Sequence, residues 1–535
     1  MTLWDWSILA SYILGIIGMS WFIGRRQKSQ EDYYLGGRRM PAWQIALSVM
    51  ATQVSAISLI GAPAFVALRS GGGLVWLQYE FAIPLAMILI MFILIPLYHR
   101  TRGITIYQYL ESRFGPETRL SISAVFLISR GLGSGVALLA TGIVMQVCLD
   151  WTLSETILLI GVVSIVYTTF GGIVADIYSD IIQLFILWSG SFIMIFILGS
   201  MLDANAWALL AAAPERMRIF DFTSTGLGDG ETFAFWPMLI GGLFLYLSYY
   251  GCDQSQAQRL LTTKSASEAQ KAMMLNGIFR FLLVLTYISI GILLIPFLAG
   301  HPEFTRQLEG QRADFVLPYF MIEYLPAGIL GLLIAGFFAA SMSSIDSALN
   351  SLSAASYQDF LLKLRPQLNN LSARNQVRLS RFLTVFWGIV ATAFALLMIG
   401  GSETVLELVN KIGSAFYGPI LATFLLGMLT RRGNQKGAIA GLIIGVAFNL
   451  MLWQLFEHEI SWLWWNVFGF MTTMVTGYVF SLTGRSQDLE FDPGLILRYT
   501  DFKQAFADKK YYLMLGIAFI FMLLISAVLE MIGKQ

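Results

Sequence analysis

The segment Trp43–Val66, WQIALSVMATQVSAISLIGAPAFV, has the length of a membrane-spanning helix but an unusual composition for one. About 20 apolar residues cross a bilayer core of roughly 30 Å, and here polar and helix-breaking residues interrupt them. These are Ser48, Thr52, Gln53, Ser55, Ser58, Gly61 and Pro63. A helix broken at mid-membrane exposes carbonyl oxygens that bind cations, whereas a helix packed through small residues has a similar composition. The residues alone leave both interpretations open.

A second segment, GFFAASMSSIDSALNS at residues 336–351, is more specific. Four of its small residues recur at three- and four-residue steps, so they share one face of a helix. They are Ala340, Ser343, Ser344 and Ser347. Hydroxyl and carbonyl oxygens suit hard cations such as Na⁺. Asp346 lies within the same face, and a carboxylate inside a membrane is usually paired or functional. Serines together with an acid favour ion binding over simple helix packing.

Both segments belong to a chain built mostly of apolar blocks. Of its 535 residues, 57% are hydrophobic and only 13% are charged, too few charges to cover a soluble protein of this length. Span-length segments recur along the chain and predict an all-α membrane protein with about fourteen transmembrane helices. They begin near residues 5, 42, 74, 120, 155, 180, 235, 273, 324, 379, 405, 437, 462 and 511. The first span runs directly into Arg25 and Arg26, which favours a retained helix over a cleaved signal peptide.

Lys and Arg are distributed unevenly between the loops that these spans define. With the N-terminus outside, the inner loops contain 25 of the 34 Lys and Arg residues, with Arg259 counted among them. The outer loops contain six and the spans three. Because positively charged loops stay on the cytoplasmic side, we expect both termini outside. The expected location is the inner membrane of a bacterium.

Charged and amide side chains also occur within or at the edges of other spans. Each is a functional-site hypothesis, because polar groups inside a membrane are expensive. They are Gln78, Glu80, Arg130, Asp180, Asp253, Arg280 and Lys411. Asp180, Asp253 and Lys411 lie near predicted helix ends, so an interfacial position is the alternative for these three.

Several function classes find no support in the composition. The net charge of +1 gives no indication of nucleic-acid binding. The two cysteines, Cys148 and Cys252, provide neither a disulfide framework nor a Cys/His metal site. The three histidines lie in predicted loops or span ends and form no catalytic cluster, so we do not expect an enzyme. The expected partners are a small solute, sodium ions and the lipid bilayer, with no obligatory protein partner evident.

Three ordered motifs carry a resemblance to a known family. They are DYYLGGRRMP at residues 32–41, DQSQAQR at 253–259 followed by KSASEAQK at 264–271, and SSIDSALNS at 343–351. These motifs resemble the sodium/solute symporter family, which includes sodium/glucose and sodium/sialate cotransporters. The resemblance extends from about residue 5 to about residue 480. It implies that the chain is a secondary transporter.

The resemblance also implies a LeuT-type fold with two inverted five-helix repeats. The repeats fall at residues 42–202 and 235–429, separated by an outer loop at 203–234. An extra helix with a basic inner loop occupies residues 1–41, and further helices occupy residues 430–535. In this fold the first helix of each repeat is broken at mid-membrane, and the solute lies between the two breaks.

Ion-binding residues follow from the resemblance position by position. The common sodium site falls on the backbone of Ala51, Val54 and Ala340 and on the hydroxyls of Ser343 and Ser344. A second sodium site, found in some members, centres on Asp180 with Ser347 as a partner. Asp346 stands where several members have a small or hydroxyl residue, which strengthens or disturbs that second site. One or two Na⁺ ions are therefore expected per transport cycle.

Solute-binding positions are mixed in character. Glu80, Tyr249 and Arg280 resemble sugar-site positions of the glucose-type members. Gln78 and Arg130 resemble positions of the sialate-type members, where an arginine binds an acidic sugar. Ser55 and Ser58 supply hydroxyls near a solute carboxylate. The set predicts a sugar, a sugar acid or another small carboxylate.

Sodium-coupled symport by alternating access is therefore the expected function. Two alternatives remain open. One is proton coupling of the same solutes through Asp180, Asp253 or Glu80. The other is a transporter-like membrane sensor, because this helical module also occurs fused to signalling domains.

Overall fold

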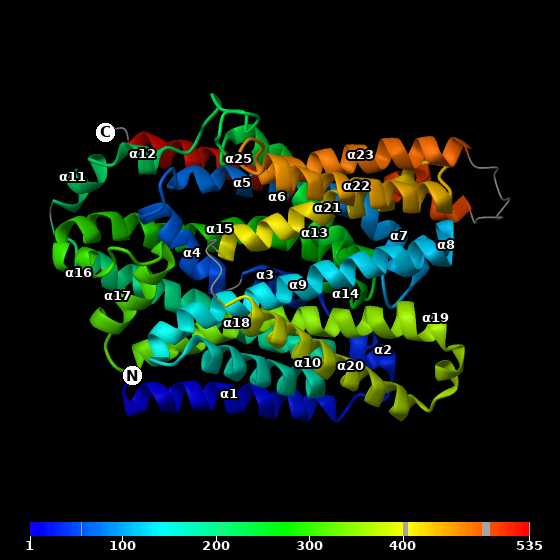
Figure 1. Ribbon diagram of the computed structural model, residues 1–535, viewed down its shortest axis with the longest axis horizontal. Helices are drawn as coiled ribbons and strands as arrows, with labels where there is room; N and C mark the ends of the chain where they lie inside the picture. The colour runs from blue at the N-terminus through cyan, green and yellow to red at the C-terminus, as the bar shows by residue number, and fades with distance from the viewer. Residues whose placement is uncertain (55, 204, 400–404, 484–492, 534–535) are drawn as a thin grey trace.

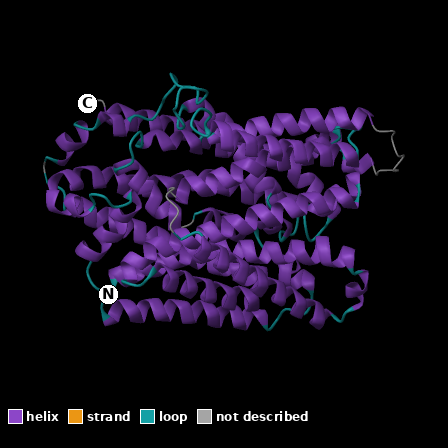
Figure 2. Ribbon diagram, viewed as in Figure 1, coloured by secondary structure: helices purple, strands orange, loops and turns teal. Residues whose placement is uncertain are grey.

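The described part of the chain is helical. The computed structural model describes residues 1–533 except for residues 55, 204, 400–404 and 484–492. No strand occurs among these residues, and two isolated bridges join Met40 to Thr263 and Leu227 to Ile460. Figure 2 shows the long helices running roughly parallel along the longest axis.

Most of the mass lies in helices of at least 22 residues. In chain order these are α1 (Leu3–Gly24), α9 (Pro116–Leu149), α10 (Leu153–Ser200), α15 (Ala266–Gly300), α18 (Ile329–Ala355), α20 (Ala373–Leu397), α21 (Val405–Leu429), α22 (Gln435–Phe456), α23 (Trp462–Thr483) and α25 (Lys509–Gly533). Shorter helices join or interrupt them. These are α2 (Gln30–Leu35), α3 (Ala42–Gln53), α4 (Ala56–Ala67), α5 (Leu77–Glu80), α6 (Ala82–Leu89), α7 (Ile95–Thr101), α8 (Tyr107–Phe114), α11 (Ala206–Ala211), α12 (Pro214–Met217), α13 (Gly242–Cys252), α14 (Gln254–Leu261), α16 (Pro302–Gln307), α17 (Val316–Tyr324), α19 (Leu362–Leu364) and α24 (Tyr499–Ala505).

The expected count of fourteen transmembrane helices is not confirmed. Ten helices of the described chain are long and apolar enough to cross a membrane, or eleven when the bent pair α3 and α4 counts as one span. One source of the difference is α10, whose 48 residues correspond to the spans expected near residues 155 and 180. A helix of that length measures roughly 70 Å, more than twice a bilayer core. Gly172 interrupts it with a non-helical backbone (φ 55°, ψ −170°).

Two helices are broken where the family resemblance implies it. The axes of α3 and α4 meet at 56°, and Val54 ends α3 in an extended conformation. Asp253 is likewise extended between α13 and α14, and its carboxylate caps α14 by accepting the Ser255 amide. Each break leaves helix-end carbonyl and amide groups without partners in their own helix. The boundaries of the two repeats stay a prediction.

Close packing of small residues holds the C-terminal helices together. Gly437, Gly441 and Gly445 recur every four residues on α22 and face Gly477 and Thr473 of α23. A Cβ at Gly441 meets the Thr473 carbonyl oxygen at 2.7 Å. Small residues at such spacing let two membrane helices approach closely, so this pair forms a compact unit beside α21.

The two chain termini lie at the same end of the molecule (Figure 1). Helices α2, α8 and α19, which flank basic segments, lie at the opposite end. This arrangement separates the termini from these basic segments.

A buried carboxylate joins the N-terminal helix to the rest of the protein. Asp5 on α1 is fully buried, and its Oδ1 accepts hydrogen bonds from the Gly328 and Gly331 amides at 2.7 and 2.8 Å. These amides belong to the N-terminus of α18, where backbone N–H groups have no partner within the helix. Oδ2 accepts the Thr2 amide at 2.7 Å. The first helix is therefore fastened to the helix that carries the serine-rich segment.

Asp5→Ala is expected to lower the thermal stability of the purified protein in detergent. The substitution leaves the buried Gly331 amide without an acceptor, and each such group costs about 1–3 kcal/mol. A fall in Tm, followed by tryptophan fluorescence, measures the effect. Asp5→Asn is the control, because it keeps one acceptor oxygen and should lose less. Equal losses in both variants contradict this role of the hydrogen bonds.

Candidate functional site

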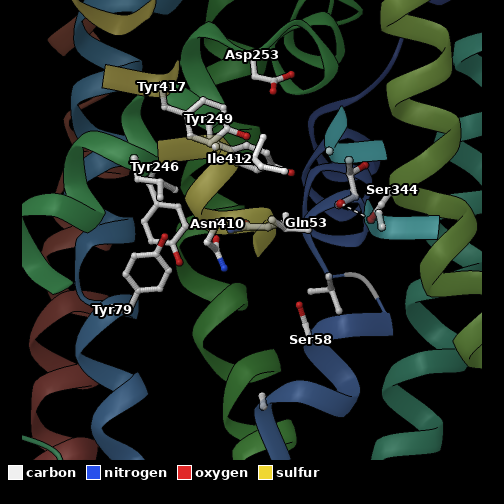
Figure 3. A pocket seen from close by; sticks show the side chains of 18 of the residues that line it. Gln53, Ser58, Tyr79, Tyr246, Tyr249, Asp253, Ser344, Asn410, Ile412 and Tyr417 are labelled. Atoms are coloured by element: carbon white, nitrogen blue, oxygen red, sulfur yellow. Dashed lines mark hydrogen bonds between the residues drawn. The ribbon is translucent and has the colours of Figure 1, made fainter. Parts of the chain in front are cut away.

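A cavity of about 190 Å³ lies where the two broken helices face each other. Helices α3, α4, α5, α9, α13, α15, α18 and α21 contribute to its wall. In Figure 3, Tyr79 and Tyr246 lie on one side and Ser344 on the other, with Gln53 and Asn410 between them. Most of the wall is aromatic or aliphatic, and a few polar groups converge on it. Such a composition is typical of a small-molecule site.

One side of the cavity contains a buried ion pair. Arg280 of α15 donates from Nε and Nη2 to the two carboxylate oxygens of Glu80, at 3.1 and 3.3 Å. Its Nη1 has no hydrogen-bond partner among the described residues. The guanidinium also lies 5.8 Å from the centre of the Tyr246 ring. Glu80 holds this arginine in place, and one nitrogen remains available to a solute.

The cavity wall also contains a second and looser ion pair. Arg130 of α9 lies 3.7 Å from the Asp253 carboxylate at the break between α13 and α14. Its Nε has no partner among the described residues, and its guanidinium lies 5.8 Å from the Tyr249 ring centre. The Tyr249 hydroxyl accepts a hydrogen bond from Gln256 at 2.8 Å. Arg130 is thus less firmly held by its own carboxylate than Arg280, and it is the better placed of the two to bind an anionic group.

A serine of α18 forms a hydrogen bond to the break between α3 and α4. The Ser344 hydroxyl donates to the Thr52 carbonyl oxygen at 2.9 Å, which Figure 3 shows as a dashed line. Val54 donates its amide to the Met50 carbonyl, close to the end of α3. Val54 and Ser344, both expected at the common sodium site, therefore lie in the wall of the cavity.

A polar network lies behind this wall, fully buried between α3, α10, α14 and α18. Asp180 accepts from Ser343 at 2.5 Å and from Arg259 Nη2 at 2.9 Å. Arg259 also donates from Nε to Ser48 at 2.7 Å and contacts Ser347. The expected residues Asp180, Ser343 and Ser347 are thus brought together.

Arg259 was placed in an inner loop by the sequence analysis, and this was wrong. Its side chain is fully buried in α14 and paired with Asp180. The apolar-length criterion failed here because α13 and α14 are two short helices separated by Asp253. The arginine that ends the motif DQSQAQR was the signal that could have indicated its burial, since a guanidinium inside a membrane is costly unless it is paired.

Asp346 of α18 belongs to the same network and is hydrogen-bonded to Ser347. Tyr167 of α10 donates its hydroxyl to Asp346 Oδ2 at 2.6 Å, and Ser347 donates its amide to Oδ1 at 2.5 Å. Both donors are neutral. Asp176, one turn before Asp180 on α10, is also fully buried, and the sequence analysis did not single it out.

The expected solute-site residues divide into three groups. Five of them line the cavity, namely Ser58, Glu80, Arg130, Tyr249 and Arg280. Ser55 lies outside the described residues. Gln78 does not line the cavity: its Nε2 donates to the carbonyls of Val75 and Phe233, and its Oε1 accepts the Asp221 amide. Gln78 therefore supports the loop that follows α12. Ala51 and Ala340, expected through their backbone, are buried in α3 and α18.

Known proteins are similar to this chain in sequence. The sequence profile of the sodium:solute symporter family matches residues 33–445. The sodium/sialic acid symporter NanT of Aliivibrio fischeri is 27% identical over 480 residues, which cover 88% of this chain and 91% of that protein. The putative sodium-dependent multivitamin transporter of Drosophila melanogaster is 30% identical over 462 residues, 83% of this chain and 74% of that protein. Sodium-coupled monocarboxylate transporter 2 of Danio rerio is 29% identical over 441 residues, which cover 81% of this chain and 68% of that protein.

Solved structures show the same architecture. A Na⁺-coupled sialic acid symporter in a substrate-bound outward-open state superposes with a TM-score of 0.81 at 23% identity, covering 90% of this chain and 98% of that one. A nucleobase-cation-symport-1 family transporter superposes with a TM-score of 0.51 at 13% identity. The match covers 91% of this chain and 99% of that one. These likenesses establish a LeuT-type transporter fold. With a family profile that spans more than three-quarters of its length, this chain belongs to the sodium:solute symporter family.

Proposed function

We propose that the protein is a sodium-coupled symporter that carries a small polar carboxylate, such as a sugar acid, by alternating access. The observation that carries this proposal is the shared wall of the cavity. Val54 and Ser344, expected to bind sodium, line the same space as Arg130 and the Glu80–Arg280 pair. An ion bound at the wall and a solute bound in the cavity therefore influence each other directly.

The break after α3 suits a sodium ion chemically. The last carbonyls of α3 lack amide partners within their own helix, and the Ser344 hydroxyl approaches them from α18, while the Ser343 hydroxyl donates to Asp180. We assign one sodium ion to the backbone oxygens of Ala51, Val54 and Ala340 with these two hydroxyls. Oxygen-only ligands match the preference of a hard cation. In this proposal sodium is cargo and enters and leaves in every cycle.

We assign a second ion to the buried network behind the wall. Asp180 and Ser347 already share Arg259 as a common partner, and Asp346 is hydrogen-bonded to the Ser347 amide. The extra carboxylate at Asp346 adds negative charge there and so strengthens the attraction for a cation. The proposed stoichiometry is one or two sodium ions per cycle.

The solute assignment rests on the two ion pairs. Arg130 is held only loosely by Asp253, so we assign it to the solute carboxylate. Glu80 and the unpartnered Arg280 Nη1 are assigned to hydroxyl groups at the other end of the solute, with Ser58 as a further hydroxyl. The names of the relatives in Aliivibrio fischeri and Danio rerio, which specify sialic acid and monocarboxylate, support a solute of this class.

In this proposal, sodium binding is coupled to solute binding because the ion joins helices that also form the solute cavity. Sodium at the break holds α3 and α4 against α18, and this favours the state that binds the solute. Solute binding then permits closure, and low sodium on the other side lets the ion leave. Such coupling requires different ion affinities in the two states. Inward movement of each sodium gains a further ~2.3 kcal/mol per 100 mV of membrane potential.

The protein is an integral membrane protein, and we place it in a bacterial inner membrane with both termini outside. The common end of the two termini in Figure 1 supports the same side for both. We also retain residues 42–202 and 235–429 as the two inverted repeats, because their first helices, α3–α4 and α13–α14, are both broken.

Proton coupling is the rival function. Glu80 and Asp253 each form an ion pair with an arginine. Asp180 is paired with Arg259 in the same way. The carboxylates named for proton coupling are therefore all matched by a fixed positive charge, and sodium coupling is the better supported function.

Ser344→Ala is expected to raise the sodium concentration for half-maximal uptake about tenfold or more, because it removes one ion ligand (~1.4 kcal/mol). Uptake of labelled sugars, sugar acids and monocarboxylates into proteoliposomes, with a sodium or a proton gradient, measures the effect. The matched control is Ser341→Ala, whose hydroxyl on the same helix bonds to Thr141 and to the Phe337 carbonyl instead. Uptake driven by protons without sodium contradicts the proposal.

Arg130→Lys is expected to raise the KM for a carboxylate solute about thirtyfold, which corresponds to ~2 kcal/mol for a charge-assisted hydrogen bond. Lysine keeps the charge beside Asp253 but loses the planar fork that binds a carboxylate through two nitrogens. Competition by an amide analogue of the same solute provides the comparison, because the neutral analogue should compete equally with both proteins. An unchanged KM for the carboxylate rules out this role for Arg130.

A further inference from the structure

Tyr287 of α15 lines the cavity, and its hydroxyl forms no hydrogen bond with any described residue. The side chain is only 1% exposed. A tyrosine hydroxyl that is buried usually has a hydrogen-bond partner. The Tyr249 hydroxyl in the same cavity, for example, accepts a hydrogen bond from Gln256. The Tyr287 hydroxyl is therefore available to a group that enters the cavity.

Tyr287 shares one wall of the cavity with Arg280. Arg280, Val284 and Tyr287 are separated by steps of four and three residues on α15, and all three line the cavity. Such steps place side chains on the same face of a helix. Long side chains of a helix point back toward its N-terminus, which directs the Tyr287 ring along this face toward Arg280. The Arg280 guanidinium is close enough to interact electrostatically with the Tyr287 hydroxyl.

Close packing of α15 against α4 fixes the position of this wall. Gly291, one turn beyond Tyr287, faces Pro63 and Val66 of α4. A Cβ added at Gly291 would meet the Val66 Cβ at 2.6 Å and the Pro63 carbonyl oxygen at 3.0 Å. Small residues let two membrane helices approach this closely. The contact leaves no space for a solute between the two helices at Gly291, and it holds Tyr287 in place relative to α4.

The available polar groups of this wall are hydrogen-bond donors. A guanidinium nitrogen donates and cannot accept, and Arg280 Nη1 has no partner among the described residues. The Glu80 carboxylate already accepts from Nε and Nη2 of Arg280. The Tyr287 hydroxyl can donate as well as accept. Two donors on one face therefore select a solute oxygen that accepts, such as a carbonyl or a hydroxyl oxygen.

We propose that Tyr287 is a specificity-determining residue of the solute site, whose hydroxyl donates together with Arg280 Nη1 to one acceptor oxygen of the solute. This inference deepens the proposed function, on which it rests, by narrowing the class of solute. The solute has a carboxylate, which is assigned to Arg130, and a carbonyl or hydroxyl oxygen at its other end. The aromatic and aliphatic part of the cavity wall suits an apolar ring or chain between these two groups.

Three ring acids that differ in one oxygen test this assignment. The probes are cyclohexanecarboxylate and its 4-hydroxy and 4-oxo derivatives, and the 4-oxo group can only accept a hydrogen bond. Their Kd values are measured with the purified full-length protein at saturating sodium, from the change in tryptophan fluorescence. Trp76 in the cavity wall contributes to this signal. We expect the wild type to bind both oxygen-bearing probes about tenfold more tightly than cyclohexanecarboxylate, because each forms a buried hydrogen bond that the unsubstituted ring lacks.

Tyr287→Phe removes the hydroxyl and keeps the ring in the cavity wall. We expect this variant to raise the Kd of the 4-oxo probe about tenfold. The Kd of cyclohexanecarboxylate should not change, because this probe has no oxygen at that end. A purely structural role of Tyr287 would weaken the binding of all three probes alike. The matched control is Tyr324→Phe, which removes a tyrosine hydroxyl from α17, outside the residues that line the cavity, and should leave all three Kd values unchanged.

Each other outcome has a distinct meaning. If Tyr287→Phe binds the 4-oxo probe as tightly as the wild type does, the inference is overturned and the proposed function stands. Equal wild-type affinities for the three probes also overturn it, and this result needs no variant that might fail to fold. The same holds if the wild type takes up other carboxylates but binds none of the three probes. A wild type that binds and takes up carboxylates without any need for sodium contradicts the proposed function itself.

Discussion

A helix that breaks inside a membrane must find new partners for the backbone groups at the break. No water is available there, and each unsatisfied group costs several kcal/mol. This protein breaks two helices, α3–α4 and α13–α14, and meets the requirement with side chains, one from another helix and one at the break itself. Ser344 reaches the Thr52 carbonyl, and the Asp253 carboxylate caps α14. The contact from Ser344 also joins α18 to the break in the wall of the cavity.

The contacts at the breaks also explain why ion and solute are coupled. A helix break that is satisfied by a neighbouring helix has two possible arrangements, one closed by protein atoms and one opened to a ligand. Here the same residues border the cavity and the expected sodium site. A cation that replaces the hydrogen bond between Ser344 and Thr52 changes the wall that the solute contacts. Energetic coupling therefore needs no long pathway through the protein.

Charge is arranged differently in the cavity and in the network behind it. In the cavity, Glu80 and Asp253 each face an arginine, so the space is neutral before the solute enters. The anionic solute that we propose would add one negative charge, which accompanying sodium ions would offset. In the network, the carboxylates outnumber the single guanidinium of Arg259. The network, where cations are expected to bind, therefore has excess negative charge. The cavity, where the solute is expected to bind, has equal numbers of acidic and basic side chains.

The sequence by itself determined the class of protein and much of the site. Apolar blocks predicted a helical membrane protein, and the polar composition of Trp43–Val66 with the serines around Ser344 indicated a broken helix and an ion site. These signals are local, because span length and helix periodicity depend on neighbouring residues. Only the tertiary structure showed that Arg259 is buried against Asp180, that Asp176 is buried as well, and that Gln78 does not line the cavity. The reason is physical: burial and pairing of a charge are set by residues far away in the chain, and no local pattern encodes them.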